Sequence, residues 1–129
     1  MNLLSKYQNQ AYALMRIVVG FMFAFHGAQK IFGVFSDFPM PAVGSQMWVG
    51  GIIELVGGLL IMIGFLTTLA AFLTSGEMAV AYFQFHWKFQ MGSMFFPGVN
   101  KGEMAVLYCF IFLFIACHGA GIWSLDKKK

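Results

Sequence analysis

The chain has 129 residues, of which 60% are hydrophobic and only 10% are charged, and its formal net charge is +3. Soluble domains carry about 25% charged residues, so this chain has too few charges to cover a water-soluble surface. The composition excludes an ordinary soluble domain and predicts an integral membrane protein with one transmembrane domain over residues 1–129.

Four apolar stretches predict an all-α membrane four-helix bundle. A helix needs about 20 residues to cross the hydrocarbon core of a bilayer, and the expected transmembrane helices cover about residues 12–35, 47–65, 67–86 and 104–123. We expect an antiparallel bundle, and an even number of spans places both termini on the same side of the membrane.

The first expected span has one face of small and polar residues. These recur every three or four positions, which puts them on one stripe of an α-helix: Arg16, Gly20, Phe23, Gly27 and Lys30. Small residues let a second membrane helix approach closely, so we expect this stripe to face the bundle interior.

The second expected span contains the run GGIIELVGGLLIMIG, residues 50–64, with Glu54 as its single charge. Glycines lie three and four residues before Glu54 and three and four residues after it, so Glu54 shares their face of the helix. A charge facing lipid is costly. The pattern therefore predicts that Glu54 points into the bundle.

The third expected span follows after a very short turn and has its own inward stripe, which includes Glu77. The interior would then hold two positive and two negative charges. We expect Arg16 to reach toward Glu77, and Lys30 to pair with Glu54 or Glu103. The predicted structural charge network is Arg16, Lys30, Glu54, Glu77 and Glu103. It either holds the helices together as salt bridges or lines a polar pocket, because charged groups inside a membrane are often functional.

Two histidines lie near the outer ends of antiparallel spans and extend this pattern. The candidate cofactor-binding pocket consists of His26, Lys30, Glu54 and His86. Such histidines can hydrogen-bond a quinone carbonyl, or they are ordinary interfacial side chains. Haem is disfavoured because two axial histidines would also need a large cavity. The pattern predicts no metal site and assigns no catalytic residue.

The fourth expected span carries both cysteines and leads into a basic end. Cys109 and Cys117 would lie about 12 Å apart along a helix, beyond the about 7 Å between disulfide-bonded Cα atoms, so thiol–disulfide chemistry is disfavoured. Lys6 and the run 127–129 predict that both termini are cytoplasmic, since positive residues favour that side. We interpret the run as a membrane-surface anchor and not as a nucleic-acid site.

Four segments resemble motifs of the DoxX family, in chain order. They are RIVVGFMFAFHGAQKIFG, ELVGGLLIMIGFLTTLAAFLTSGEMAVAYFQFHW, NKGEMAVLYC and HGAGIWSLD. The positions that fit the family pattern are Arg16, Gly20, His26, Gly27, Lys30, Glu54, Gly57, Gly58, Gly64, His86, Glu103, Gly121, Ser124 and Asp126. Glu77 is a departure from it. The resemblance implies a compact four-helix bundle in the bacterial cytoplasmic membrane. It also implies an association with quinone-linked or thiol-redox complexes, without naming a reaction.

Three functions remain open. The first is a redox-associated membrane subunit that binds a quinone-like molecule, in contact with lipid and with other membrane redox subunits. The second is a non-catalytic scaffold or assembly subunit whose buried charges only hold the bundle together. The third is a carrier for a small solute or proton, which the lack of inverted repeats and broken helices disfavours. A chain this short is also expected to form a homo-oligomer or to work with a partner, but not with nucleic acid.

Overall fold

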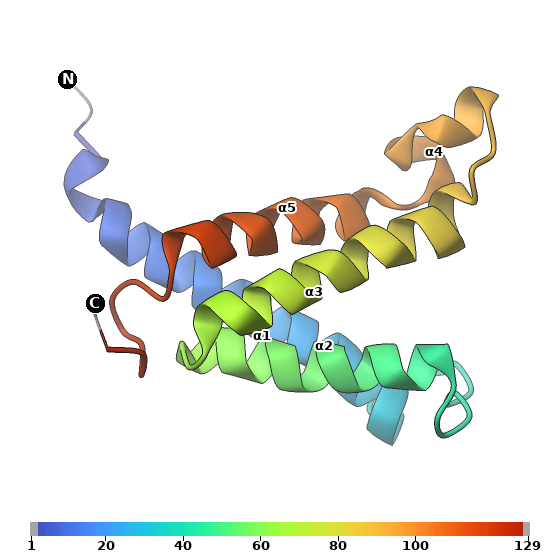
Figure 1. Cartoon of the computed structure of the whole chain (residues 1–129), viewed down its shortest axis with the longest axis horizontal. Helices are drawn as coiled ribbons and strands as arrows, with labels where there is room; N and C mark the ends of the chain where they lie inside the picture. Colours follow the sequence, from blue (N-terminus) through green and yellow to red (C-terminus); the bar gives the residue numbers. More distant parts are fainter. Residues whose placement is uncertain (1–2, 128–129) are drawn as a thin grey trace.

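The computed structural model describes residues 3–127, which form helices joined by loops, with no strand in that range (Figure 1). The four long elements are α1 (Gln8–Phe32), α2 (Gln46–Ile63), α3 (Thr67–Ala81) and α5 (Glu103–His118). Shorter turns complete the chain: η1 (Ser5–Tyr7), η2 (Tyr82–Trp87), η3 (Gly92–Phe95) and α4 (Pro97–Asn100). The all-α class is confirmed.

Two segments of the described chain are long and apolar enough to cross a membrane, Ser5–Phe32 and Gln46–Ile63. The other two expected spans look different. The helix α3 continues without a break into the π-helical turn η2. The helix α5 has 16 residues and ends at His118, so the expectation of a helix up to residue 123 is wrong. Gly119 and Gly121 adopt positive φ angles there, which glycine tolerates and a continuing helix does not.

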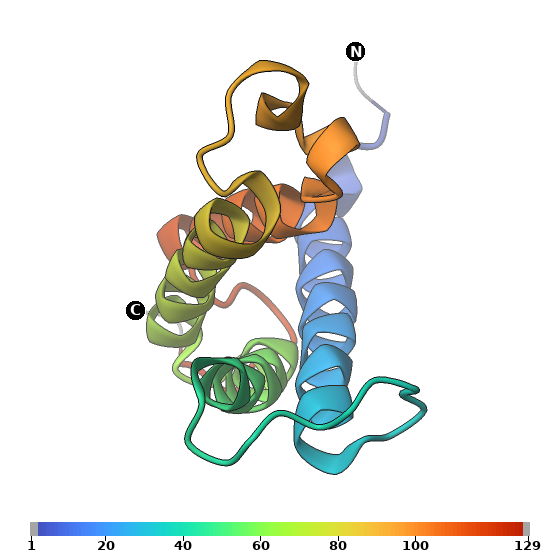
Figure 2. The ribbon, with the colours of Figure 1, turned by 90° about the vertical axis from the view of Figure 1, so that its right-hand side faces the viewer.

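The helices form two pairs. Figure 2 shows α1 against α2 on one side and α3 beside α5 on the other, and the tight turn after Gly64 joins the pairs as an α2–α3 hairpin. The beginning of α1 and the segment that follows α5 lie at the same end (Figure 1), where the Tyr12 hydroxyl donates to the Gly119 carbonyl. The loop 33–45 and the segment from η2 to α4 lie at the opposite end.

Glycines set the spacing of α1 and α2. A Cβ atom on Gly27 would lie 2.6 Å from the Gly51 carbonyl oxygen, and one on Gly20 would lie 2.6 Å from the Met62 nitrogen. Such a Cβ cannot fit, because both neighbours are backbone atoms. The glycine faces therefore make the close helix contact that their spacing predicted.

The molecule is apolar outside and partly polar inside. Large side chains such as Phe72 and Phe110 are more than 60% exposed. Six polar or charged residues are buried within residues 3–127: Arg16, Glu54, Thr67, Thr74, Ser75 and Asn100. Phe23 of α1 meets Phe112 of α5 in the core, with ring centroids 4.7 Å apart. An exposed apolar surface of this extent is typical of contact with lipid or with another protein.

Arg16 closes the end of the bundle where the chain termini lie. Its guanidinium donates to the carbonyls of Ile61 and Met62 at 2.7 and 2.8 Å, and to those of Ile122 and Trp123 at 3.1 and 2.7 Å. The expected contact with Glu77 is wrong. The last carbonyls of α2 lie beyond the regular hydrogen bonds of the helix, and although Ile61 also accepts from the Gly64 amide, these carbonyls bind the fully buried Arg16 charge in place of Glu77.

Asp126 completes this end of the fold. Its carboxylate accepts hydrogen bonds from the amides of Leu66 and Thr67, both at 2.9 Å, where α3 begins. Burial alone would raise the pKa of Asp126, but these hydrogen bonds and the nearby Arg16 charge outweigh it and hold the pKa below its ordinary value. The segment after α5 thus ties the end of α2 to the start of α3.

Candidate functional site

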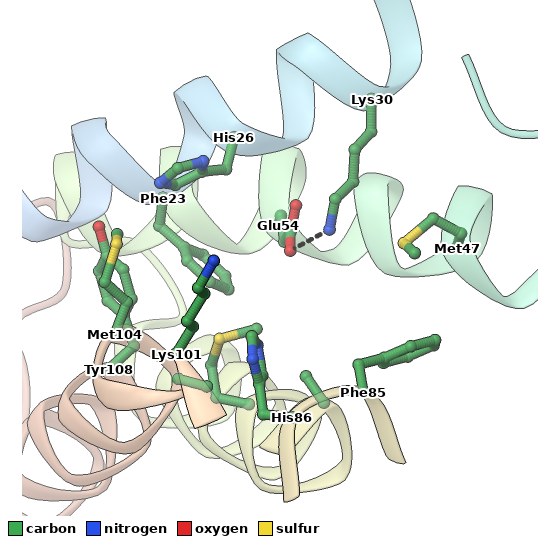
Figure 3. A pocket seen from close by; sticks show the side chains of 13 residues that line it. Phe23, His26, Lys30, Met47, Glu54, Phe85, His86, Lys101, Met104 and Tyr108 are labelled. Carbon is green, nitrogen blue, oxygen red and sulfur yellow. Dashed lines mark hydrogen bonds and ion pairs between the residues drawn. The ribbon is translucent and has the colours of Figure 1, made fainter. Parts of the chain in front are cut away.

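A pocket of about 410 Å³ lies between the helices (Figure 3). All four long helices contribute to its wall, as do η2 and the residue after α4. Its polar and charged lining residues are His26, Lys30, Glu54, His86, Lys101 and Tyr108, and its other lining residues are Phe23, Met47, Met78, Ala81, Phe85, Met104 and Ala105. The four residues of the sequence-predicted pocket therefore line one cavity.

Lys30 and Glu54 form an ion pair across the contact of α1 and α2. The Lys30 ammonium donates to Glu54 Oε1 at 2.6 Å, and the Lys30 Cβ packs against Gly51. Glu54 is only 4% exposed. Its other oxygen, Oε2, is buried and has no hydrogen-bond partner among the described residues. One acceptor on the pocket wall is therefore unsatisfied.

The two histidines reach the pocket from different elements. His26 lies on α1, one turn before Lys30, and its ring meets Tyr108 of α5 edge-on with centroids 6.4 Å apart. His86 lies in η2, where the π-helical turn alters the α-helical spacing. Over residues 3–127 neither imidazole forms a hydrogen bond, so both remain able to bind a ligand.

Sequence reasoning missed two polar residues of the pocket. Tyr108 is 7% exposed, and its hydroxyl is buried without a hydrogen-bond partner in the described chain. Lys101 follows α4 with a φ of +62°, and its side chain extends toward the pocket in Figure 3. Tyr108 could have been found as the inward tyrosine one turn after Met104. Nothing local indicates where Lys101 points.

The two remaining acids of the predicted charge network lie apart from the pocket wall. Glu103 is exposed in the first turn of α5, where a carboxylate is favoured by the helix dipole, and the alternative pairing of Lys30 with Glu103 is wrong. Glu77 packs over α2, where a Cβ on Gly50 would lie 2.9 Å from Glu77 Oε1. Its Oε2 atom is buried and unpartnered within the described range.

The side chains of the described residues do not form a cluster of metal ligands. No group of three or more His, Cys, Asp or Glu residues in that part could hold a metal ion. The pocket instead combines an apolar wall with nitrogen and oxygen atoms that can donate to or accept from an organic ligand. Its chemistry suits a small molecule with an apolar body and a few polar atoms.

Comparisons with known proteins identify relatives of this chain. The model of the DoxX family matches residues 11–87. An uncharacterized protein from Haemophilus influenzae is 43% identical over 135 aligned residues, which cover 99% of this chain and 97% of the relative. No solved structure matches significantly.

Proposed function

This chain belongs to the DoxX family of membrane proteins, and from that premise we propose that it is a redox-associated membrane subunit that binds a quinone-like molecule. The pocket of His26, Lys30, Glu54 and His86 would hold the ligand. In this proposal the protein neither carries a metal nor has an assigned catalytic residue. It would present the ligand to other membrane redox subunits.

The proposed setting is the bacterial cytoplasmic membrane. Four helices would span the bilayer in an antiparallel bundle, with α3 extended by η2 and α5 extended by the segment after it. The exposed apolar faces and the buried polar residues support this arrangement. Lys6 and Lys127 favour cytoplasmic termini by the positive-inside rule. Lys128 and Lys129, which strengthen that expectation, lie outside the described residues.

The unsatisfied oxygens of the pocket are the observation that carries the ligand proposal. A buried polar atom without a partner costs about 1–3 kcal/mol, and Glu54 Oε2 and Tyr108 Oη are two such atoms, each belonging to a residue that lines the pocket. A quinone carbonyl would accept from Lys30 or a histidine, and a quinol hydroxyl would donate to Glu54. The volume of about 410 Å³ falls in the range of small-molecule sites.

The scaffold reading remains a second candidate because of one observation. The ion pair between Lys30 and Glu54 joins α1 to α2 directly, which is what a purely structural role requires. Buried ion pairs, however, stabilise proteins weakly compared with apolar packing. A structural role alone also leaves Glu54 Oε2 and Tyr108 Oη without partners.

Quinone binding can be measured on the purified protein. We would extract lipid-soluble cofactors from protein in mild detergent. We would then titrate a short-chain quinone and its quinol while following tryptophan fluorescence, to which Trp87 contributes from a position next to His86. Glu54→Gln removes the charged acceptor, so quinol binding should weaken about tenfold or more. Glu103→Gln changes an exposed acid outside the pocket and should bind like the wild type.

The outcomes separate the two candidates. Saturable binding that Glu54→Gln weakens, in a variant that still folds by circular dichroism, supports the ligand proposal. If the wild type retains no quinone and shows no saturable quenching, the ligand proposal fails. If Glu54→Gln does not fold and the wild type does not bind quinone, the scaffold function is the candidate that remains.

A further inference from the structure

We propose that Glu54 and Glu77 share a single proton beside Lys30, and that this acid pair supplies a proton to an oxyanion of a ligand in the pocket. The shared proton is a property of the protein alone. The transfer of that proton to a ligand, called the supply step below, rests on the ligand-binding function proposed above. It gives a role to Glu77, which does not line the pocket.

Three helices bring the acid pair together around two glycines of α2. Glu54 lies one helical turn after Gly50, on the same face. Glu77 of α3 covers Gly50, because its Oε1 atom occupies the space that a Cβ would need. Lys30 of α1 packs its Cβ against Gly51, the next residue. Without side chains on these glycines, Glu54, Glu77 and Lys30 lie around one stretch of α2, where the Lys30 ammonium pairs with Glu54.

The charges do not balance if both acids are ionised. Lys30 satisfies Oε1 of Glu54, whereas Oε2 of Glu54 and Oε2 of Glu77 are buried without any partner among residues 3–127. The Glu77 carboxyl also interacts electrostatically with both Glu54 and Lys30. Two close carboxylates that have one counter-ion and little solvent hold a proton between them.

The other titratable groups near the pair cannot replace that proton. Tyr108 faces Glu54 from α5 and brings a neutral hydroxyl. His26 and His86 line the pocket, but neither is hydrogen-bonded to an acid within the described residues. Lys30 is paired with Glu54, which matches its charge. Lys101 also lines the pocket, but it forms no ion pair with either acid among residues 3–127.

The position of each acid gives it a separate part in the transfer. Glu54 lines the pocket and Glu77 lies behind it. A ligand with a phenolate-like oxygen would take the one shared proton through the carboxyl of Glu54, and Glu77 would hold that proton until the ligand arrives. The O–H bond of the acid breaks and the O–H bond of the ligand forms, with no electron moving. The pair is left with two carboxylates beside Lys30 and regains its proton from water.

Infrared spectroscopy in an ester-free detergent tests the shared proton without any ligand. The chain has only five Asp and Glu residues, so the carboxylic acid C=O region is simple. We expect one band at neutral pH that shifts in D₂O. The band should disappear in Glu77→Gln, where Lys30 alone balances Glu54. It should also disappear in Glu54→Gln, because Lys30 becomes free to balance Glu77.

Two further variants make this test specific. Lys30→Met removes the counter-ion, so both acids become protonated and the band should about double. Glu103→Gln alters an exposed acid and should leave the band unchanged. The shared proton is refuted if the wild type has no band, or if a folded Glu54→Gln keeps it, since burial of Glu77 alone would then explain it. Circular dichroism checks that each variant folds, and Lys30→Met decides the question if Glu54→Gln does not.

The supply step has its own probe, 4-nitrophenolate, which is yellow as the anion and colourless when protonated. Binding to the wild type at mildly alkaline pH should bleach the anion band, and Glu77→Gln at equal occupancy should not. No bleaching with wild type overturns the supply step, whether or not the probe binds. An infrared band without any quinone binding would refute the proposed function and leave the shared proton standing.

Discussion

The positive charge of Arg16 is stabilised by backbone carbonyl dipoles. It is fully buried, yet its partners are four carbonyl oxygens and not a carboxylate of the described chain. Two of them end α2, where the helix dipole is negative, and two belong to the segment after α5. One side chain therefore connects three parts of the molecule.

Replacing Arg16 should destabilise the protein strongly. Arg16→Met would leave buried carbonyls without donors, at a cost of about 3 kcal/mol in the free energy of unfolding. Arg16→Lys keeps the positive charge but carries it on one nitrogen, so its free energy of unfolding should lie between those of the wild type and Arg16→Met. Unfolding in mixed micelles with rising SDS, followed by circular dichroism, measures the difference. Lys6→Met removes an exposed charge and should stay within about 0.5 kcal/mol of the wild type. An equally small effect of Arg16→Met would contradict the role.

Glu54 and Arg16 show what helical spacing in the sequence can and cannot predict about a single residue. The spacing placed Glu54 among glycines and so predicted its burial, because a face is a local property of the helix. The partner of Arg16 depends on a chain reversal more than 100 positions later, with sequence separations of 106 and 107. Helical periodicity within one span holds no information about a contact with such a distant segment. The sequence pattern therefore predicted Glu77 as the partner of Arg16, which is wrong.

At the scale of elements, the glycines have unequal importance although the sequence presents them alike. Gly27 and Gly58 sit in the contact of α1 with α2, where added Cβ atoms would meet backbone. Gly76 of α3 has open space around the same position. The α1–α2 pair is therefore held at a separation that side chains would increase.

Two glycine-to-alanine changes should have opposite effects. Gly27→Ala pushes a methyl group against the backbone of α2, and overpacking of this kind costs about 1–3 kcal/mol. Gly76→Ala adds a methyl group to open space and removes a flexible residue from a helix, which stabilises by about 0.5–1 kcal/mol. Thermal unfolding in one detergent should give a lower Tm for the first and an unchanged or higher Tm for the second. Equal shifts would show that the close contact is absent.

For the whole molecule, the apolar exterior and the helix pairs are consistent with a membrane bundle, and the number of spans is open to direct test. The sequence predicted the four long helices because each lies in a long apolar stretch with few charges. It did not predict the early end of α5, which depends on Gly119 and Gly121 turning the chain. For the pocket, Lys30 and Glu54 were expected from helical stripes, and His26 and His86 from their places near the outer ends of two expected spans. Lys101 was missed because it lies in irregular chain.

Cysteine labelling should distinguish four spans from two. In a background with Cys109 and Cys117 changed to serine, we would introduce Lys6→Cys, Lys88→Cys or Lys127→Cys, all at exposed positions. With four spans, a membrane-impermeant maleimide should label the first and third only in inverted vesicles and the second only in spheroplasts. If only α1 and α2 cross the bilayer, Lys6→Cys and Lys88→Cys will react from the same side.

The contacts of Arg16 also have a consequence for biosynthesis. In the proposed arrangement Arg16 enters the membrane with α1, but Ile122 and Trp123 are made more than 100 residues later. Throughout that interval the buried charge lacks half of its acceptors. A chain that stalls before these residues would therefore expose an incompletely solvated arginine in the bilayer, a feature by which quality-control proteases can distinguish unfinished molecules from finished ones.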